Sequence, residues 1–260
     1  SIRRQRQMCI RDRVYTVLTG AVILQSCQSG YTIVSVEGGR VPITDVYDKH
    51  PDANAETTLA PYKAKIDSIM TPVIGYSAAK LTSYRPESPL SNLIADLLRS
   101  CAQQKTGVMP DVGVMNIGGI RNILNKGEIT VGNMYEISPF QNALAIATMK
   151  GDVLLELFQQ IAAVHGEGLS GANLEITQDG KLLKATVNGK AIDPAKSYQV
   201  ATIDYLAEGN DKLEAFKKAE SKTTPSDAVL RDLFIDYVRD CQAKGKFINS
   251  SVEGRIRIIK

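Results

Sequence analysis

Residues 111–121 read Asp111-Val112-Gly113-Val114-Met115-Asn116-Ile117-Gly118-Gly119-Ile120-Arg121, and this stretch joins a strand to a polar turn. Val112, Val114 and Met115 predict a short buried strand. Gly118 and Gly119 predict a sharp turn after it, because glycine tolerates positive φ and lets a ligand approach bare backbone N–H groups. We therefore expect a buried strand that ends in an open loop.

Two polar side chains frame this turn. The Asn116 amide can both donate and accept hydrogen bonds, as recognition of a base edge requires. Arg121 carries a planar guanidinium that suits a phosphate or a carboxylate. Together they predict a small site for an anionic ligand. The alternative, from these residues alone, is an ordinary turn with a solvated arginine.

The overall composition is that of a soluble globular protein, with 43% hydrophobic and 23% charged residues among 260. Residues 1–13 contain five arginines and one aspartate, so they contribute +4 to the net charge of +3 and the remainder carries −1. A nearly neutral folded part gives no support for nucleic-acid binding. We expect no nucleic-acid partner.

Four cysteines are spread along the chain, and none of them forms a C-x-x-C pair. This spacing excludes a cysteine zinc site and a disulfide-rich scaffold. Cys9 and Cys27 lie in the N-terminal leader. Cys101 and Cys241 lie in predicted helices, where a buried thiol is the default and a single disulfide is the alternative.

The first 26 residues predict a leader. Residues 14–26 carry no charge, follow an arginine-rich start and suit the core of an export signal. Leu24-Gln25-Ser26-Cys27 resembles a bacterial lipobox, which implies lipid attachment at Cys27 and a lipid-anchored protein in the bacterial cell envelope, facing the periplasm or the surface. The alternatives are a plain secretory signal or an N-terminal core strand. Residues 8–13 resemble translated sequencing-adapter sequence, so residues 1–26 are set apart from the fold.

Residues 27–56 predict an irregular segment with one strand over 31–36, and strands alternate with helices after it. Ser88 and Pro89 predict a helix start, followed by an apolar stripe at helical spacing. We expect helices over 57–70, from 89 onward, over 151–165 and over 226–244. Strands are predicted over 73–81, 112–115, 128–132, 142–149, in 173–203 with hairpin turns at Asp179-Gly180 and Asn188-Gly189, and over 255–259. This mixture predicts a layered α/β (α+β) domain.

Three further segments join the glycine turn: residues 91–96 (SNLIAD), 138–142 (SPFQN) and 204–211 (DYLAEGND). In this order and spacing they resemble the C-terminal, substrate-binding domain of the 5′-nucleotidase / UDP-sugar hydrolase family. The resemblance runs from residue 57 to residue 260. It implies a single layered α/β/β/α domain that grips the nucleoside part of a nucleotide.

Carried over by position, the resemblance implies a role for each of several residues. Asn116 would contact the base and Arg121 the phosphate beside Gly118 and Gly119, while Phe140 and Tyr205 would sandwich the base and Asp211 would bind the ribose hydroxyls. The physical chemistry agrees, because base–aromatic stacking contributes ~1–3 kcal/mol per base and a carboxylate accepts from vicinal hydroxyls. The alternatives are core packing for the two rings and a turn role for Asp211.

The sequence departs from the family pattern at two positions near the site. Ile117 stands where many members have glycine, although the Gly118-Gly119 pair is kept. The family carries another phosphate-binding arginine near the helix that contains residues 91–96. Arg85 lies about one residue away from that place, which Tyr84 occupies.

The family's chemistry belongs to a metallophosphatase domain with a two-metal site built from Asp, His and Asn. This chain contains only His50 and His165, has no G-N-H-E, and has a single D-x-H triplet, Asp48-Lys49-His50. We therefore expect no catalytic residue, metal or cofactor in this chain. The leading hypothesis is the nucleotide-recognition half of a split 5′-nucleotidase, whose separate metallophosphatase chain holds the divalent metals. The alternatives are a non-enzymatic nucleotide- or nucleoside-binding lipoprotein and a degenerate interaction module.

Overall fold

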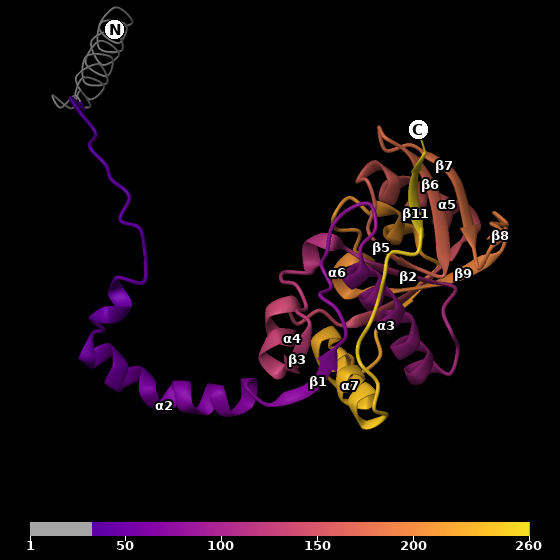
Figure 1. Ribbon diagram of the computed structural model, residues 1–260. Coiled ribbons are helices and arrows are strands. Elements are labelled where there is room, and N and C mark those ends of the chain that lie inside the picture. The colour runs from indigo at the N-terminus through magenta and orange to yellow at the C-terminus, as the bar shows by residue number, and fades with distance from the viewer. Residues whose placement is uncertain (1–32, 260) are drawn as a thin grey trace, which may run out of the picture. The chain divides into compact units, whose positions relative to one another are not determined.

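A computed structural model describes residues 33–259, and the chain forms two units, residues 1–56 and 57–260 (Figure 1). The predicted leader with Cys9 and Cys27 lies outside the described residues, so lipid attachment and export stay predictions. In the described part of the first unit, η2 (Tyr47–Lys49) is a 3-10 turn and α2 (Ala53–Met70) begins. Residues 33–36, the described part of the strand predicted over 31–36, form no strand.

The second unit mixes helices and strands along its whole length, which confirms the predicted α/β class. After α2, the chain forms β1 (Val73–Ser77), α3 (Pro89–Thr106), β2 (Val112–Met115), η3 (Ile117–Gly119), β3 (Gly127–Thr130), α4 (Val131–Ile137), β4 (Leu144–Lys150) and α5 (Gly151–Ala163). It continues with β5 (Gly168–Ser170), β6 (Ala172–Thr177), β7 (Leu182–Val187), β8 (Lys190–Ala191), β9 (Ser197–Ile203), α6 (Asp204–Ala207), η4 (Glu214–Lys218), β10 (Ser221–Thr223), α7 (Leu230–Ala243) and β11 (Ile256–Ile259).

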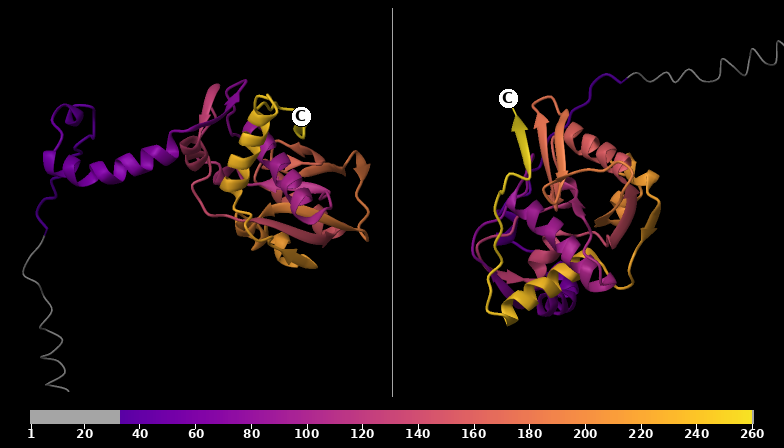
Figure 2. Two further views of the ribbon diagram at one scale, coloured as in Figure 1. Left: turned by 90° about the horizontal axis from the view of Figure 1, so that it is seen from below. Right: turned by 90° about the vertical axis from the view of Figure 1, so that its right-hand side faces the viewer.

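The strands form three sheets. The largest has the order β10-β4-β9-β2-β5, the second has the order β11-β6-β7-β8, and β1 pairs with β3. Helix α3 packs on β2, β5 and β9, while α5 contacts strands of both larger sheets (Figure 2). Helix α7 packs on β1, α3 and α4. The site-bearing strand β2 therefore lies inside the largest sheet and directly under a helix.

Helix α3 begins where the sequence predicts and ends at a glycine. Ser88 is the N-cap in extended backbone, Pro89 fills the first turn, and Gly107 ends the helix with φ 78° and its N–H donating to the Gln103 carbonyl. The predicted apolar stripe is buried in the core, through Leu90, Leu93, Ile94, Leu97 and Leu98. Burial of side chains of this size stabilises the fold by roughly 1.5–3 kcal/mol each.

Strand β2 is buried at all four positions and runs parallel to β9 and antiparallel to β5. A Cβ built on Gly113 would lie 2.4 Å from the Ala95 carbonyl oxygen and 2.8 Å from Arg99 Cγ. The backbone of β2 can therefore approach α3 only because residue 113 has no side chain. This contact fixes the distance between α3 and β2, the strand that Asn116 follows.

Tertiary contacts shorten or add several elements relative to the sequence prediction. The helix predicted over 226–244 begins only at Leu230, because Asp227 lies in the left-handed region at φ 52°. The strand predicted over 128–132 ends at Thr130, which caps the unpredicted helix α4 through a reciprocal pair of hydrogen bonds with Asn133. Strands β5 and β10 were likewise not predicted.

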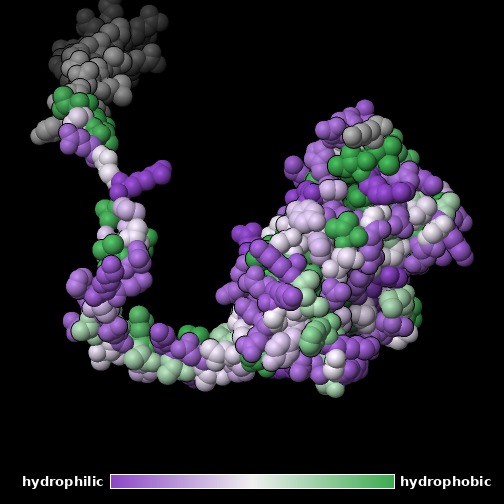
Figure 3. All heavy atoms as spheres, viewed as in Figure 1, coloured by the Kyte–Doolittle hydropathy of each residue, from purple (hydrophilic) through white to green (hydrophobic). Residues whose placement is uncertain are grey.

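The two described cysteines, Cys101 and Cys241, are free thiols, and Cys101 is buried. None of the helices within residues 33–259 has the length and apolar content needed to cross a bilayer. On the face drawn in Figure 3, hydrophobic residues of the second unit form small groups, one of them beside the C-terminal end of β11. Polar residues surround these groups.

Replacing Gly113 by alanine is expected to destabilise the fold by roughly 1–3 kcal/mol, because the added methyl group cannot fit between β2 and α3. Gly118→Ala is the matched control, since its Cβ would lie 3.7 Å or more from every neighbouring atom. Denaturant unfolding of both variants measures the difference. Equal stability of the two variants would contradict the close approach at Gly113.

Candidate functional site

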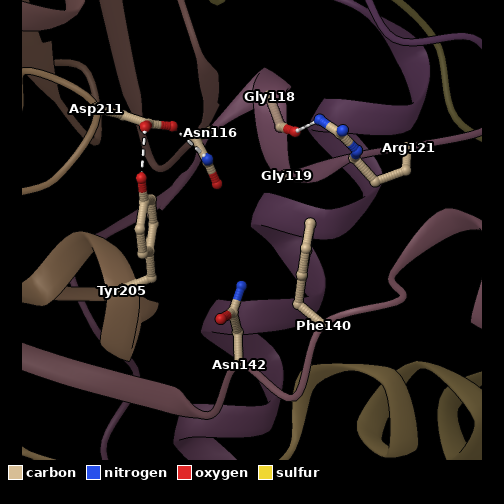
Figure 4. Close-up of a pocket in the computed structure, with 8 residues that line it drawn as sticks. All are labelled: Asn116, Gly118, Gly119, Arg121, Phe140, Asn142, Tyr205 and Asp211. Atoms are coloured by element: carbon tan, nitrogen blue, oxygen red, sulfur yellow. Dashed lines mark hydrogen bonds between the residues drawn. The ribbon is translucent and has the colours of Figure 1, made fainter. Parts of the chain in front are cut away.

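A pocket of about 390 Å³ opens where β2 ends, and three separate segments line it (Figure 4). Seven of the predicted ligand-binding residues take part, joined by Asn142, which the sequence analysis did not single out. The lining residues are Asn116, Gly118, Gly119, Arg121, Phe140, Asn142, Tyr205 and Asp211. The structure thus brings together side chains that lie up to 95 positions apart in the chain.

The turn after β2 is η3, and its glycines serve a different purpose from the one predicted. Neither Gly118 nor Gly119 has a positive φ, so the expectation of left-handed backbone at this pair is wrong. A Cβ on Gly119 would instead lie 2.6 Å from Asn116 Oδ1 and 2.9 Å from Met115 Cε. Residue 119 must be small because the Asn116 side chain folds over it.

The Asp211 carboxylate is held by two donors from two different segments. Asn116 Nδ2 donates to Asp211 Oδ2 at 2.5 Å, and the Tyr205 hydroxyl donates to Asp211 Oδ1 at 2.9 Å (Figure 4). This neighbouring carboxylate raises the pKa of the Tyr205 phenol, since it accepts the phenolic hydrogen bond and repels a phenolate. The phenol therefore keeps its proton at neutral pH.

This end of the pocket presents hydrogen-bond acceptors. The Asn116 side chain is 4% exposed, and with Nδ2 committed to Asp211 its Oδ1 has no partner within the described residues. The Tyr205 proton is committed to Asp211 as well. A ligand group placed here must bring donors of its own, because the remaining capacity lies on carboxylate and amide oxygens.

The two aromatic rings stand on opposite sides of the pocket. Figure 4 shows Tyr205 and Phe140 facing each other across the open space, and the two side chains are 42% and 45% exposed. Arg121 lies beyond Phe140, with its guanidinium carbon 5.7 Å from the ring centroid and Nη1 donating to the Gly118 carbonyl at 3.0 Å. The rings therefore stay accessible to a flat ligand between them.

Asn142 enters the pocket at the end opposite Asp211. Its side chain points into the space between the two rings in Figure 4, and its amide makes no hydrogen bond to another described residue. The sequence held one signal for it, because Asn142 lies two residues after Phe140 and alternate residues of an extended segment share a side. The segment that carries Phe140 therefore contributes two side chains to the pocket.

A buried carboxylate that the sequence analysis missed lies behind the turn. The pairing of Met115 with Gly168 places Glu167 next to η3, where its carboxylate accepts from the Ile117 N–H and from Arg85. Glu167 is 1% exposed, and burial raises the pKa of its carboxyl, although the two donors partly offset this. Arg85 also donates to the Gly166 carbonyl at 2.8 Å, and it is not among the residues that line the pocket.

The metal donors that a two-metal phosphatase site needs are not gathered here. Within residues 33–259, no three histidine, cysteine, aspartate or glutamate side chains are grouped so that they could hold a metal ion. The whole sequence contains two histidines. Since two-metal sites are built from such donors, the described residues do not fit one.

The family model of the 5′-nucleotidase C-terminal domain matches residues 69–218, which include the whole pocket. The chain belongs to this family. The resemblance stated from the sequence motifs is thereby confirmed, together with the fold that it implied.

Individual relatives extend the match. The chain is 30% identical to the cell wall protein Lmo0130 of Listeria monocytogenes over 90% of its own length and 34% of that protein's. It is 35% identical to the endonuclease YhcR of Bacillus subtilis over 60% of its own length and 13% of that protein's. A 5′-nucleotidase precursor from Thermus thermophilus superimposes with a TM-score of 0.69 at 25% identity, covering 80% of this chain and 43% of that one. The chain thus spans less than half of each of these relatives.

Glu167→Gln tests the cost of the buried carboxylate. The folded-state pKa of Glu167 lies above the unfolded value, so the wild type is most stable relative to the variant below about pH 4.3 and loses that advantage as the pH rises through the folded-state pKa. The loss is about 1.4 kcal/mol for each unit by which folding raises the pKa. Denaturant unfolding of both proteins across this pH range measures it.

Glu128→Gln, at an exposed position, controls for the removal of one charge. A stability difference between wild type and Glu167→Gln that rises with pH would contradict the assignment.

Proposed function

We propose that this domain is the nucleotide-recognition component of a 5′-nucleotidase and hydrolyses nucleotide phosphate esters only together with a metallophosphatase chain. The observation that carries the proposal is the pair of accessible rings, Phe140 and Tyr205, on opposite sides of one pocket. A purine or pyrimidine has two π-faces, and each can stack on one ring.

The polar ends of the pocket orient such a base. The acceptor-rich end at Asp211 and Asn116 Oδ1 suits the vicinal hydroxyls of ribose, which bring donors. Asn142, at the other end, offers both a donor and an acceptor to a base edge. The base would then lie between the two rings, with its edge at Asn142 and its ribose at Asp211.

Arg121 supplies the positive charge for the phosphate. Its guanidinium has five N–H donors, of which one is used on the Gly118 carbonyl, so the others remain for a phosphate oxygen. The Thermus relative is a 5′-nucleotidase precursor, and this supports a phosphate ester as the ligand class.

In this scheme the chain contributes binding and orientation. When bound in the partner chain, the two divalent metals supply an activated water and stabilise the phosphoryl oxygens. The residues described here hold the base and sugar, and that placement turns the attack into an effectively intramolecular reaction. The divalent metals, the partner chain and the lipid anchor at Cys27 are parts of this proposal.

Calorimetric titration with AMP and adenosine tests the ring clamp. Phe140→Ala and Tyr205→Ala should each weaken binding roughly fivefold to 150-fold, since stacking contributes ~1–3 kcal/mol per base. Phe247→Ala is the matched control, because Phe247 is an exposed ring that contacts Tyr76 outside the pocket. Unchanged affinity in both pocket variants, or no binding by the wild type, would overturn the proposal.

A phosphate-release assay tests the division of labour. The pure chain with AMP and Mg²⁺ or Mn²⁺ should release no phosphate, because the described residues do not group the donors of a two-metal site and the sequence has only two histidines. The Thermus 5′-nucleotidase serves as the positive control in the same assay. Metal-dependent turnover that persists through repeated purification and is lost in Asp211→Ala would place the chemistry in this chain.

A further inference from the structure

The Tyr205 hydroxyl has a role that its ring does not explain. It donates its only proton to Asp211 Oδ1 at 2.9 Å, at the end of the ring nearest the acceptor-rich end of the pocket (Figure 4). A ring that only stacked on a base would need no hydroxyl group. The bond therefore points to a task for Tyr205 that depends on Asp211.

Asp211 lies in a stretch of backbone that disfavours ordinary side chains. Gly209, Asp211 and Lys212 have φ values of 81°, 54° and 66°, all in the left-handed region. A residue other than glycine in this region costs of order 1 kcal/mol or more. Such a loop keeps one conformation only when contacts outside it hold it in place.

The contacts that hold the carboxylate come from two separate elements. Asn116, at the end of β2, fixes one oxygen, and Tyr205, in α6, fixes the other. Asn210 Nδ2 also donates to the Tyr205 carbonyl at 2.8 Å, which ties the loop back to the same helix. Removal of the hydroxyl would leave the carboxylate anchored on one oxygen only.

The orientation of this carboxylate decides what the pocket can recognise. Each carboxylate oxygen has about two lone-pair sites, and one site on each oxygen is already occupied. The two free sites can accept from two hydroxyl groups on neighbouring carbons if the carboxylate plane is fixed. A sugar that lacks one hydroxyl would leave one site unused, and discrimination of this kind is strong when the acceptor is rigid.

We propose that the Tyr205 hydroxyl positions Asp211 and thereby makes this pocket select ribonucleosides over 2′- and 3′-deoxyribonucleosides. The proposal rests on the proposed function, and it assigns separate tasks to two parts of one side chain. The ring stacks on the base, and the hydroxyl sets the sugar specificity through the carboxylate. Tyr205 is in this second respect a positioning residue.

The test compares Tyr205→Phe with the wild type, because phenylalanine keeps the ring and removes only the hydroxyl. Calorimetry with adenosine, 2′-deoxyadenosine and 3′-deoxyadenosine gives the ribose-to-deoxyribose affinity ratio for each protein. The ratio in Tyr205→Phe should fall about tenfold, as expected for loss of an oriented hydrogen bond to a charged group. Affinity for the deoxynucleosides should change little, since stacking is preserved.

Tyr198→Phe is the matched control, since its buried hydroxyl accepts from the Asp193 N–H at 3.0 Å and lies outside the pocket lining. Its affinity ratio should equal that of the wild type. An unchanged or increased ratio in Tyr205→Phe, or a wild type without ribose preference, overturns the role of the hydroxyl while adenosine binding leaves the proposed function standing. Failure of the wild type to bind any of the three nucleosides overturns the proposed function itself.

Discussion

The pocket depends on the burial of β2 on both of its faces. All four residues of the strand are buried between β9 and β5, and α3 rests on the bare backbone of Gly113. A shift by one residue would turn every side chain to the other face and drive a side chain into α3. The register of β2 is thereby fixed, and it places Asn116 in the lining of the pocket.

From that fixed point, the rest of the site is assembled by hydrogen bonds between distant segments. Asn116 Nδ2 donates a hydrogen bond to Asp211 in the loop after α6. The Ile117 N–H donates to Glu167, the residue before β5. Within the pocket, Asn116, Tyr205 and Asp211 already hold one another through hydrogen bonds. Such a site loses little conformational freedom when a ligand arrives, which favours affinity without new contacts. This arrangement supports the proposed role in nucleotide recognition.

The sequence predicted the features that depend on local pattern. The strand over 112–115 and the start of α3 at Ser88-Pro89 follow from apolar spacing and capping chemistry, and both are confirmed. The resemblance supplied the seven residues that the structure gathers in one pocket. Their individual roles in binding stay predictions, because convergence in space is weaker evidence than a bound ligand.

Features that depend on distant neighbours could not be predicted. Gly119 is small because a side chain three residues earlier folds over it, and turn chemistry alone suggested positive φ instead. Glu167 lies next to η3 because β5 pairs with β2, and β5 itself was not predicted. The late start of α7 follows from the left-handed backbone at Asp227, which no helical periodicity reveals.

Glu167 links the stability of the fold to the turn beside the pocket. Because burial raises the pKa of the Glu167 carboxyl, its ionisation costs more free energy in the folded chain than in the unfolded one. The same carboxylate accepts a hydrogen bond from the Ile117 N–H and so anchors the turn beside the pocket. The position of η3 beside the pocket is thereby coupled to the protonation state of a buried acid.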